Sequence, residues 1–131
     1  ALAFDGFRWH ARAFCQNDAV FKDFLLSRIV EVGDTQSATA DPVSDDAWNT
    51  EVVLEIGPHL ELSDTQRSAI EMDYGMEEGR AQITVRRALL FYALKRLGLD
   101  TGPTVRPPNE QQIVLINADD VFGALGKPVP W

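Results

Sequence analysis

A strict two-residue alternation over residues 7–15 constrains the fold of this chain more than any other feature of its sequence. Since successive side chains of a β-strand point to opposite faces of a sheet, the pattern predicts a strand with one apolar and one basic face. The apolar face includes two aromatic rings and is expected to be buried. It comprises Phe7, Trp9, Ala11, Ala13 and Cys15, and the basic face comprises Arg8, His10 and Arg12.

The basic face has the residue types and the spacing of an anion-binding site. Side chains at positions i, i+2 and i+4 of a strand lie about 7 Å apart, a spacing that suits successive oxygens of a phosphodiester. Arginine can bind such oxygens through two parallel N–H donors. Equally open is an ordinary solvated strand face, on which the same cations contact only water.

A second strand is expected to return alongside the first and to extend the basic patch. A turn at residues 16–18 leads into a strand over residues 21–32, and residues 1–4 read as a short strand joined to the alternating stretch by an Asp-Gly turn. On the returning strand Lys22, Phe24, Leu26 and Arg28 have one parity, and the candidate ligand-binding residues are therefore Arg8, His10, Arg12, Lys22, Phe24 and Arg28.

These stretches carry a resemblance to a known family. The run from Asp5 to Cys15, followed by residues 21–29, resembles the second half of a WYL domain, which is named after a Trp-Tyr-Leu triplet in bacterial transcriptional regulators. Trp9 matches the first residue of that triplet. The RWHxRA pattern over residues 8–13 is similar to the pattern in regulators that lie beside phage-defence gene clusters. The resemblance implies a small Sm-like β-barrel that senses a ligand.

The number of strands indicates an incomplete barrel. Three strands of this length cannot close on themselves, and they leave open edges. The first residue is also Ala and not Met. We therefore expect the chain to begin within a domain, with residues 1–32 forming the C-terminal half of the barrel.

The remainder of the chain reads as a linker and a second folded segment. Residues 33–50 are rich in small and acidic side chains and show no apolar periodicity, as is typical of a linker. In residues 51–131, strands are expected at 51–56, 80–86 and 112–116, and helices at 64–73, 88–97 and from 117 to about 126. The predicted fold class is therefore α+β, with the partial barrel followed by a small α/β sandwich of order βαβαβα.

The second segment resembles the WCX-type extension that follows WYL domains in the same regulators. The resemblance implies an N-terminal winged helix that binds operator DNA, a barrel that senses a ligand, and an extension that assists dimer contacts. The helix at 88–97 is apolar nearly all round, so one face can cover the sheet and another is expected to meet a second subunit. The residues on which the resemblance to the WCX-type extension rests are Leu60, Ser63, Gln66, the run Asp73–Met76, the run Arg86–Tyr92, and Leu97 to Asp100.

The distribution of charge limits the partners that the chain can bind. Its formal net charge is -8, yet residues 1–30 carry +1 and the remainder carries -9. Because phosphate contacts need clustered Lys and Arg, a chain this acidic is a poor binder of duplex DNA by itself. The single cysteine permits no internal disulfide and favours a reducing cytoplasm, and no apolar run approaches the ~20 residues of a membrane span.

Sequence patterns for catalysis or metal binding do not occur. There is no zinc motif, no Cys/His cluster and no glycine-rich phosphate loop, so we expect no metal and no cofactor. His59 is expected to be an exposed turn residue. Three functions stay open: a ligand-sensing and dimerising part of a regulator, a structural module whose basic face docks an acidic surface, and a hydrolase with His10 as general base. We expect the first of these, and no enzymatic activity.

Overall fold

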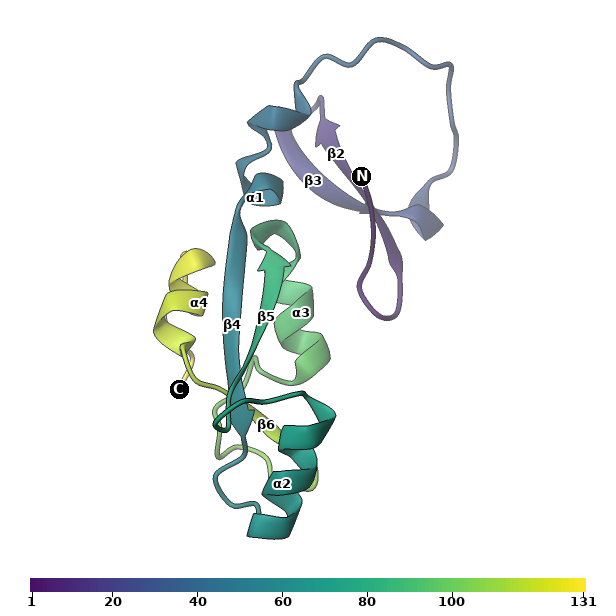
Figure 1. Ribbon diagram of the computed structural model, residues 1–131. Helices are drawn as coiled ribbons and strands as arrows, with labels where there is room; N and C mark the ends of the chain where they lie inside the picture. Colours follow the sequence, from purple (N-terminus) through teal and green to yellow (C-terminus); the bar gives the residue numbers. More distant parts are fainter.

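The computed structural model describes residues 1–131 and contains two small antiparallel sheets and four α-helices (Figure 1). The first sheet has the strand order β1-β2-β3 and the second has the order β5-β4-β6. Between the sheets, the chain makes a wide arc over residues 29–41 (Figure 1). The elements are β1 (Leu2–Phe4), β2 (Trp9–Cys15), β3 (Val20–Leu25), α1 (Asp46–Asn49), β4 (Glu51–Pro58), α2 (Asp64–Asp73), β5 (Ala81–Arg86), α3 (Leu90–Leu97), β6 (Ile113–Leu115) and α4 (Ala118–Ala124), with 3-10 turns η1 (Leu26–Arg28), η2 (Pro42–Ser44) and η3 (Arg87–Leu89).

Strand β4 is the centre of the second sheet. Leu54 lies opposite Ile83 of β5, and Ile56 lies between Ala81 of β5 and Leu115 of β6. Along β5, exposed and partly buried side chains alternate from Ala81, as expected for residues 80–86. The order of elements from β4 to α4 is βαβαβα, as predicted. Strand β4 continues two residues beyond its expected end, through Pro58, because β6 pairs with this part of the strand.

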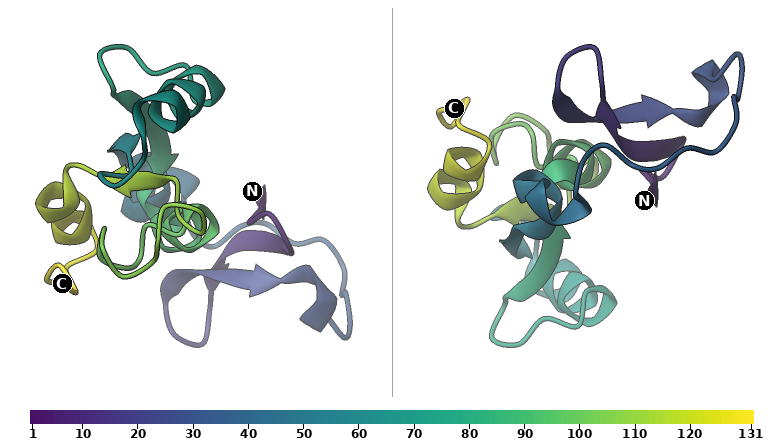
Figure 2. Two further views of the ribbon diagram at one scale, coloured as in Figure 1. Left: turned by 90° about the horizontal axis from the view of Figure 1, so that it is seen from below. Right: turned by 90° about the horizontal axis from the view of Figure 1, so that it is seen from above.

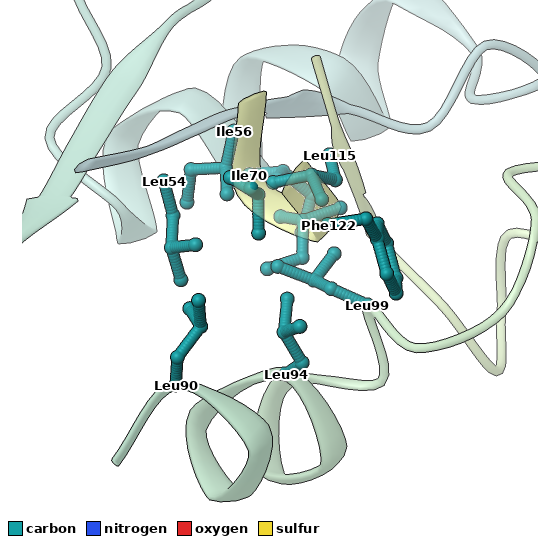
Figure 3. Close-up of a cluster of buried hydrophobic side chains, with 10 residues drawn as sticks. Leu54, Ile56, Ile70, Leu90, Leu94, Leu99, Leu115 and Phe122 are labelled. Carbon is teal, nitrogen blue, oxygen red and sulfur yellow. The ribbon is translucent and has the colours of Figure 1, made fainter. Parts of the chain in front are cut away.

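The hydrophobic core lies between the second sheet and its helices. Figure 3 shows Leu90 and Leu94 of α3 pointing toward the side chains of the sheet. Helix α3 ends at Gly98, whose φ of 68° lies in the left-handed region that glycine adopts without steric cost. The core residues are Leu54, Ile56, Ile70, Leu90, Leu94, Leu99, Ile113, Leu115, Val121 and Phe122.

The start of α2 follows directly from its sequence. The Ser63 side chain accepts the Gln66 N–H at 3.3 Å, and the Gln66 side chain accepts the Ser63 N–H at 3.0 Å. This reciprocal pair satisfies two backbone donors that would otherwise have no partner at the helix start. None of the four helices has both the length and the apolar character that crossing a bilayer demands.

His59 differs from its expected position. It is 0% exposed, so the expectation of an exposed turn residue is wrong. Strand β4 extends to Pro58 by pairing with β6, and His59 therefore lies beside Gln112, the residue before β6. Its backbone N–H donates to the Gln112 carbonyl at 2.9 Å, and its Nδ1 accepts the Glu61 N–H at 3.2 Å.

The first sheet is open, with three strands and no closure into a barrel. The short strand before residue 5 and the strand over the alternating stretch are both present. The returning strand ends at Leu25 and not at residue 32, since the chain turns there into η1. Arg28 therefore lies on a 3-10 turn, and the expectation that it lies on a strand is wrong.

The first sheet buries the face opposite to the one expected. His10 is 3% exposed, whereas Phe7 and Trp9 are exposed. Within these residues the polar face is the one that lies against the rest of the molecule, and the Trp9 face is left exposed, which is consistent with the expected incomplete barrel. Figure 2 shows the first sheet lying beside α3.

Candidate functional site

Strand register divides the candidate residues between the two faces of the first sheet. Arg12 lies opposite Asp23, whereas Lys22 lies opposite Ala13. Because paired residues of an antiparallel sheet share a face, Lys22 is on the face opposite to Arg12. Lys22 makes an ion pair with Asp18 in its own hairpin. The expectation that Lys22 extends the basic patch is therefore wrong.

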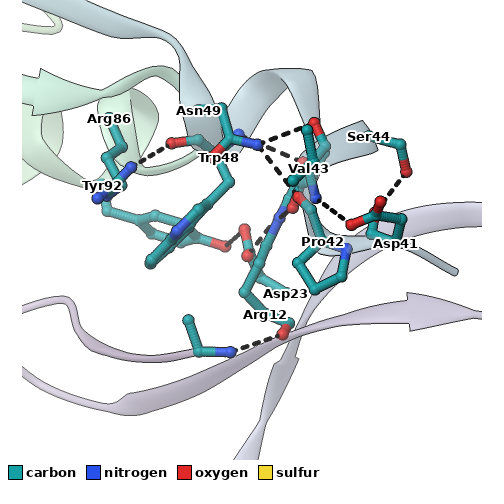
Figure 4. A network of polar contacts seen from close by, with 12 residues as sticks. Arg12, Asp23, Asp41, Pro42, Val43, Ser44, Trp48, Asn49, Arg86 and Tyr92 are labelled. Atoms are coloured by element: carbon teal, nitrogen blue, oxygen red, sulfur yellow. Dashed lines mark hydrogen bonds and ion pairs between the residues drawn. The ribbon is translucent and has the colours of Figure 1, made fainter. Parts of the chain in front are cut away.

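Arg12 is held by carboxylates of the chain itself (Figure 4). Its Nε and Nη2 donate to the two oxygens of Asp45 at 2.7 and 2.8 Å, and its Nη1 donates to Asp23 at 3.2 Å. Asp45 also accepts the Trp48 N–H as the N-cap of α1. The guanidinium of Arg12 holds the pKa of Asp45 below its ordinary value. Arg12 therefore links the first sheet to the segment that leads into β4.

A second carboxylate organises the loop between β1 and β2. His10 Nε2 donates to Asp5 Oδ2 at 2.7 Å, and the N–H groups of Phe7 and Arg8 donate to Asp5 Oδ1 at 2.8 and 2.6 Å. The hydrogen bond from His10, followed by those from the backbone, lowers the pKa of Asp5 to about 2. Gly6 completes this tight loop with a φ of 94°, a backbone conformation that favours glycine.

Tyr92 of α3 joins the first sheet to the second part of the molecule. Its ring centroid lies 4.7 Å from that of His10, and its hydroxyl donates to Asp23 Oδ2 at 3.5 Å (Figure 4). Burial, together with the nearby charge of Asp23, raises the pKa of Tyr92. The hydroxyl therefore stays a donor over the neutral pH range.

Four of the six candidate residues border one cavity of about 370 Å³. Arg28 makes no ion pair, and Arg8 has only a distant one, at 3.9 Å from Asp5. The buried Nδ1 of His10 has no hydrogen-bond partner. The cavity thus combines two available guanidinium groups with an imidazole. Its lining residues are Arg8, His10, Asp23, Phe24, Leu25, Arg28, Ile29 and Tyr92.

Sequence reasoning missed three residues that build this region, namely Asp5, Asp45 and Tyr92. In the sequence Asp5 stands in a predicted turn, and Asp45 stands in the predicted linker. A signal for Asp45 exists, because an Asp three residues before Trp48 fits an N-cap. Tyr92 is a polar-tipped ring within an apolar helix, and such a hydroxyl usually finds a partner when it is buried.

Comparison with known proteins identifies relatives for most of the chain. Residues 51–121 match the family described as "BrxR transcriptional regulator, C-terminal dimerization domain". Over 122 residues the chain is 41% identical to the DNA-binding transcriptional repressor CapW of Stenotrophomonas maltophilia. This alignment covers 92% of the chain and 41% of the relative. It is 37% identical over 125 residues to CapW of Escherichia coli strain KTE188, with coverage of 95% and 42%.

A further relative gives a similar picture. The chain is 40% identical over 124 residues to CapW of Pseudomonas aeruginosa, covering 92% of this chain and 40% of the relative. The chain thus spans about two fifths of the length of these curated relatives.

Proposed function

The chain belongs to the family of BrxR transcriptional regulators through their C-terminal dimerization domain, and from this membership we infer that it is the ligand-sensing and dimerising portion of a transcriptional repressor. In this proposal residues 1–32 are the second half of a WYL-type barrel, residues 33–50 are a linker, and residues 51–131 are a WCX-type extension. A winged helix outside these residues binds operator DNA, and the protein acts in the cytoplasm.

Self-association is the first part of the proposal and is directly measurable. The family description names a dimerization domain over residues 51–121. Sedimentation equilibrium at micromolar concentration should give twice the chain mass of 14.6 kDa. Identical subunits of a homodimer usually associate through a two-fold axis. A single species of monomer mass across the micromolar range would contradict this part.

An anion site at the 370 Å³ cavity is the second part of the proposal, and one observation carries it. Arg8 and Arg28 border a cavity without a close carboxylate partner, although the chain has a net charge of -8. Guanidinium groups in such a position can bind phosphate oxygens through paired N–H donors. A short nucleic acid or a nucleotide is the ligand class that best matches this chemistry.

The other candidates have supporting roles or none in this proposal. His10 donates Nε2–H to Asp5 and so fixes the carboxylate that also accepts the Arg8 backbone N–H. Phe24 also borders this cavity, but its pairing with Ala11 places its side chain on the face opposite to His10, so it has no direct role in this proposal. Arg12 and Lys22 make no direct contact with the ligand, since their donors are engaged by Asp45 and Asp18.

Fluorescence anisotropy with a labelled ten-nucleotide oligothymidylate tests this site on the 131-residue chain. Arg28→Ala should weaken binding by about 1.5–3 kcal/mol, the contribution of a hydrogen bond to a charged group. The matched control is Lys22→Ala, which removes one cation from the opposite face of the same sheet and should leave affinity unchanged. The affinity should also fall as salt rises, because counterions are released on phosphate binding. Equal affinities for wild type and Arg28→Ala would remove the anion site from the proposal.

A purely structural interaction module is the second candidate function, and one contact favours it. Arg12 of the basic face already docks on Asp45, an acidic residue of the chain itself. On this reading the basic face serves to hold the first sheet against the rest of the molecule. A dimer that binds no oligonucleotide and no mononucleotide would support this function over ligand sensing.

A further inference from the structure

Strand β5 leaves one border of the second sheet open. The two borders of this sheet are β5 and β6 (Figure 1). Strand β6 has three residues, all buried, and beyond it the Asn117 side chain closes β4 by accepting the Glu55 N–H and donating to the Val53 carbonyl, both at 2.9 Å. Strand β5 has six residues, and its Gln82 and Thr84 are exposed. The open border is therefore β5.

The hydrogen-bond pattern shows which backbone groups of β5 point outward. The Arg87 N–H donates to the Thr50 carbonyl at 2.8 Å, one position beyond the end of the β4–β5 register. Because bonded and non-bonded pairs alternate along an antiparallel ladder, β5 bonds to β4 at every second residue, beginning with Val85. The N–H and C=O groups of Gln82 and Thr84 therefore point away from β4, and no turn, loop or cap hydrogen bond uses them.

The sequence of β5 contains none of the features that usually protect a free edge. Such edges tend to be very short, or they carry Lys, Pro or a β-bulge. Residues 81–85 include no charged residue, no Pro and no Gly, and Ile83, Thr84 and Val85 are β-branched. Arg86 at the end of the strand is engaged elsewhere, because its Nη1 donates to the Trp48 carbonyl at 2.7 Å. This edge is thus a template for pairing with another strand.

A second copy of the chain is the partner that the surroundings of β5 favour. The strand lies within residues 51–121, which match a family described as a dimerization domain. Because the chain has a net charge of -8, contact between two copies is least unfavourable along an uncharged strip such as residues 81–85. There is open space beside the strand, since Thr84 borders a cavity of about 600 Å³ and Gln82 borders one of about 410 Å³.

We propose that β5 pairs in antiparallel register with β5 of a second copy, across a two-fold axis that joins the two second sheets into one. This inference rests on the proposed function, because it names the surface through which the chain associates with itself. Thr84 then lies opposite Thr84 of the partner subunit and exchanges two hydrogen bonds with it, and Gln82 lies opposite Arg86 of the partner subunit. A shift by two residues would place Arg80 opposite Arg86 of the partner subunit, and like charges in that position are unfavourable.

Sedimentation equilibrium of charge variants at the two-fold axis tests both the surface and the register. Thr84→Lys and Thr84→Glu each place like charges opposite each other, and each should weaken the dimer about fivefold, the effect of one unfavourable cross-strand pair. Mixing the two variants in equal amounts should restore a dimer, because Lys then lies opposite Glu. The matched control is the same pair of substitutions at Thr104, an exposed threonine in the loop before β6, which should dimerise like wild type alone and mixed.

A proline variant removes the outward donor itself. Thr84→Pro eliminates an N–H that makes no bond to β4, and proline is tolerated on an edge strand in this orientation. The dimer should weaken about 25-fold, since two hydrogen bonds are lost across the axis at about fivefold each. Thr84→Val keeps the N–H and the β-branched shape, so it should dimerise like wild type. Circular dichroism checks the fold of each variant, and if Thr84→Pro does not fold, the charge variants alone decide.

The outcomes separate this inference from the proposed function. Weaker association of the Lys and Glu variants that recovers only when they are mixed supports the pairing of β5. If wild type is a dimer and all Thr84 variants dimerise equally well, the dimer uses another surface, such as the face of α3 that carries the exposed Phe91, and the inference fails alone. If wild type has monomer mass across the micromolar range, the inference and the proposed self-association fail together.

Discussion

Replacing Arg12 with alanine should destabilise the protein strongly, although the sequence places this residue among the candidate ligand-binding residues. Arg12 donates three hydrogen bonds to two carboxylates, and the side chains of Arg12 and Asp45 are only 11% and 6% exposed. Removing one partner of such a pair leaves a nearly buried charge without compensation, which costs about 3–5 kcal/mol. Because some exposure remains, we expect a loss of about 3 kcal/mol, at the lower end of that range.

The assay is equilibrium unfolding in urea, followed by tryptophan fluorescence, to which Trp48 contributes; the backbone N–H of Trp48 donates to Asp45. Protein concentration is kept constant, because the stability of a dimer depends on it. The double variant Arg12→Ala/Asp45→Ala removes the guanidinium and one of its two carboxylates. It should recover part of the loss, since only Asp23, which still accepts a hydrogen bond from Tyr92, is left without its cation.

A matched control is available on the same sheet. Lys22 and Asp18 also form an ion pair, but their side chains are 46% and 51% exposed. Solvent screens such a pair, so Lys22→Ala should leave the free energy of unfolding close to that of wild type. If Arg12→Ala costs no more than Lys22→Ala, the argument that burial makes the Arg12 pair structural is refuted.

Three further predictions concern pH, capping and packing. The pKa of Asp5 is lowered from 3.8 to about 2, and that of Asp45 is also lowered. Both carboxylates therefore stabilise the fold above about pH 4, and this stabilisation should be lost as the pH falls toward 2. Acid titration followed by circular dichroism measures the loss. Ser63→Ala should lower the free energy of unfolding by about 1 kcal/mol, with Ser63→Thr close to wild type in the same urea assay. Leu54→Ala in the core should cost about 2–5 kcal/mol, and a cost under about 1 kcal/mol would mean that this site is poorly packed.

Several elements of the fold could be predicted from the sequence because each depends on residues close together in the chain. The capping box at Ser63 needs only a residue three positions later, and the end of α3 needs only Gly98. The alternation over residues 81–86 likewise reports a strand with one buried face. For the first sheet, the same periodicity indicated two faces of opposite character.

Only the tertiary structure decided which of those two faces is covered. Parity places His10 and Trp9 on opposite sides of β2, but burial depends on what lies against each side, and this comes from elements far along the chain. Asp45 and Tyr92 supply partners for the polar face, so His10 is buried and Trp9 is exposed. The 370 Å³ cavity has the same origin, because Arg8 and Tyr92 border it together only when the loop after β1 packs beside α3. Local patterns thus determined the elements of this protein, and long-range packing determined its candidate site.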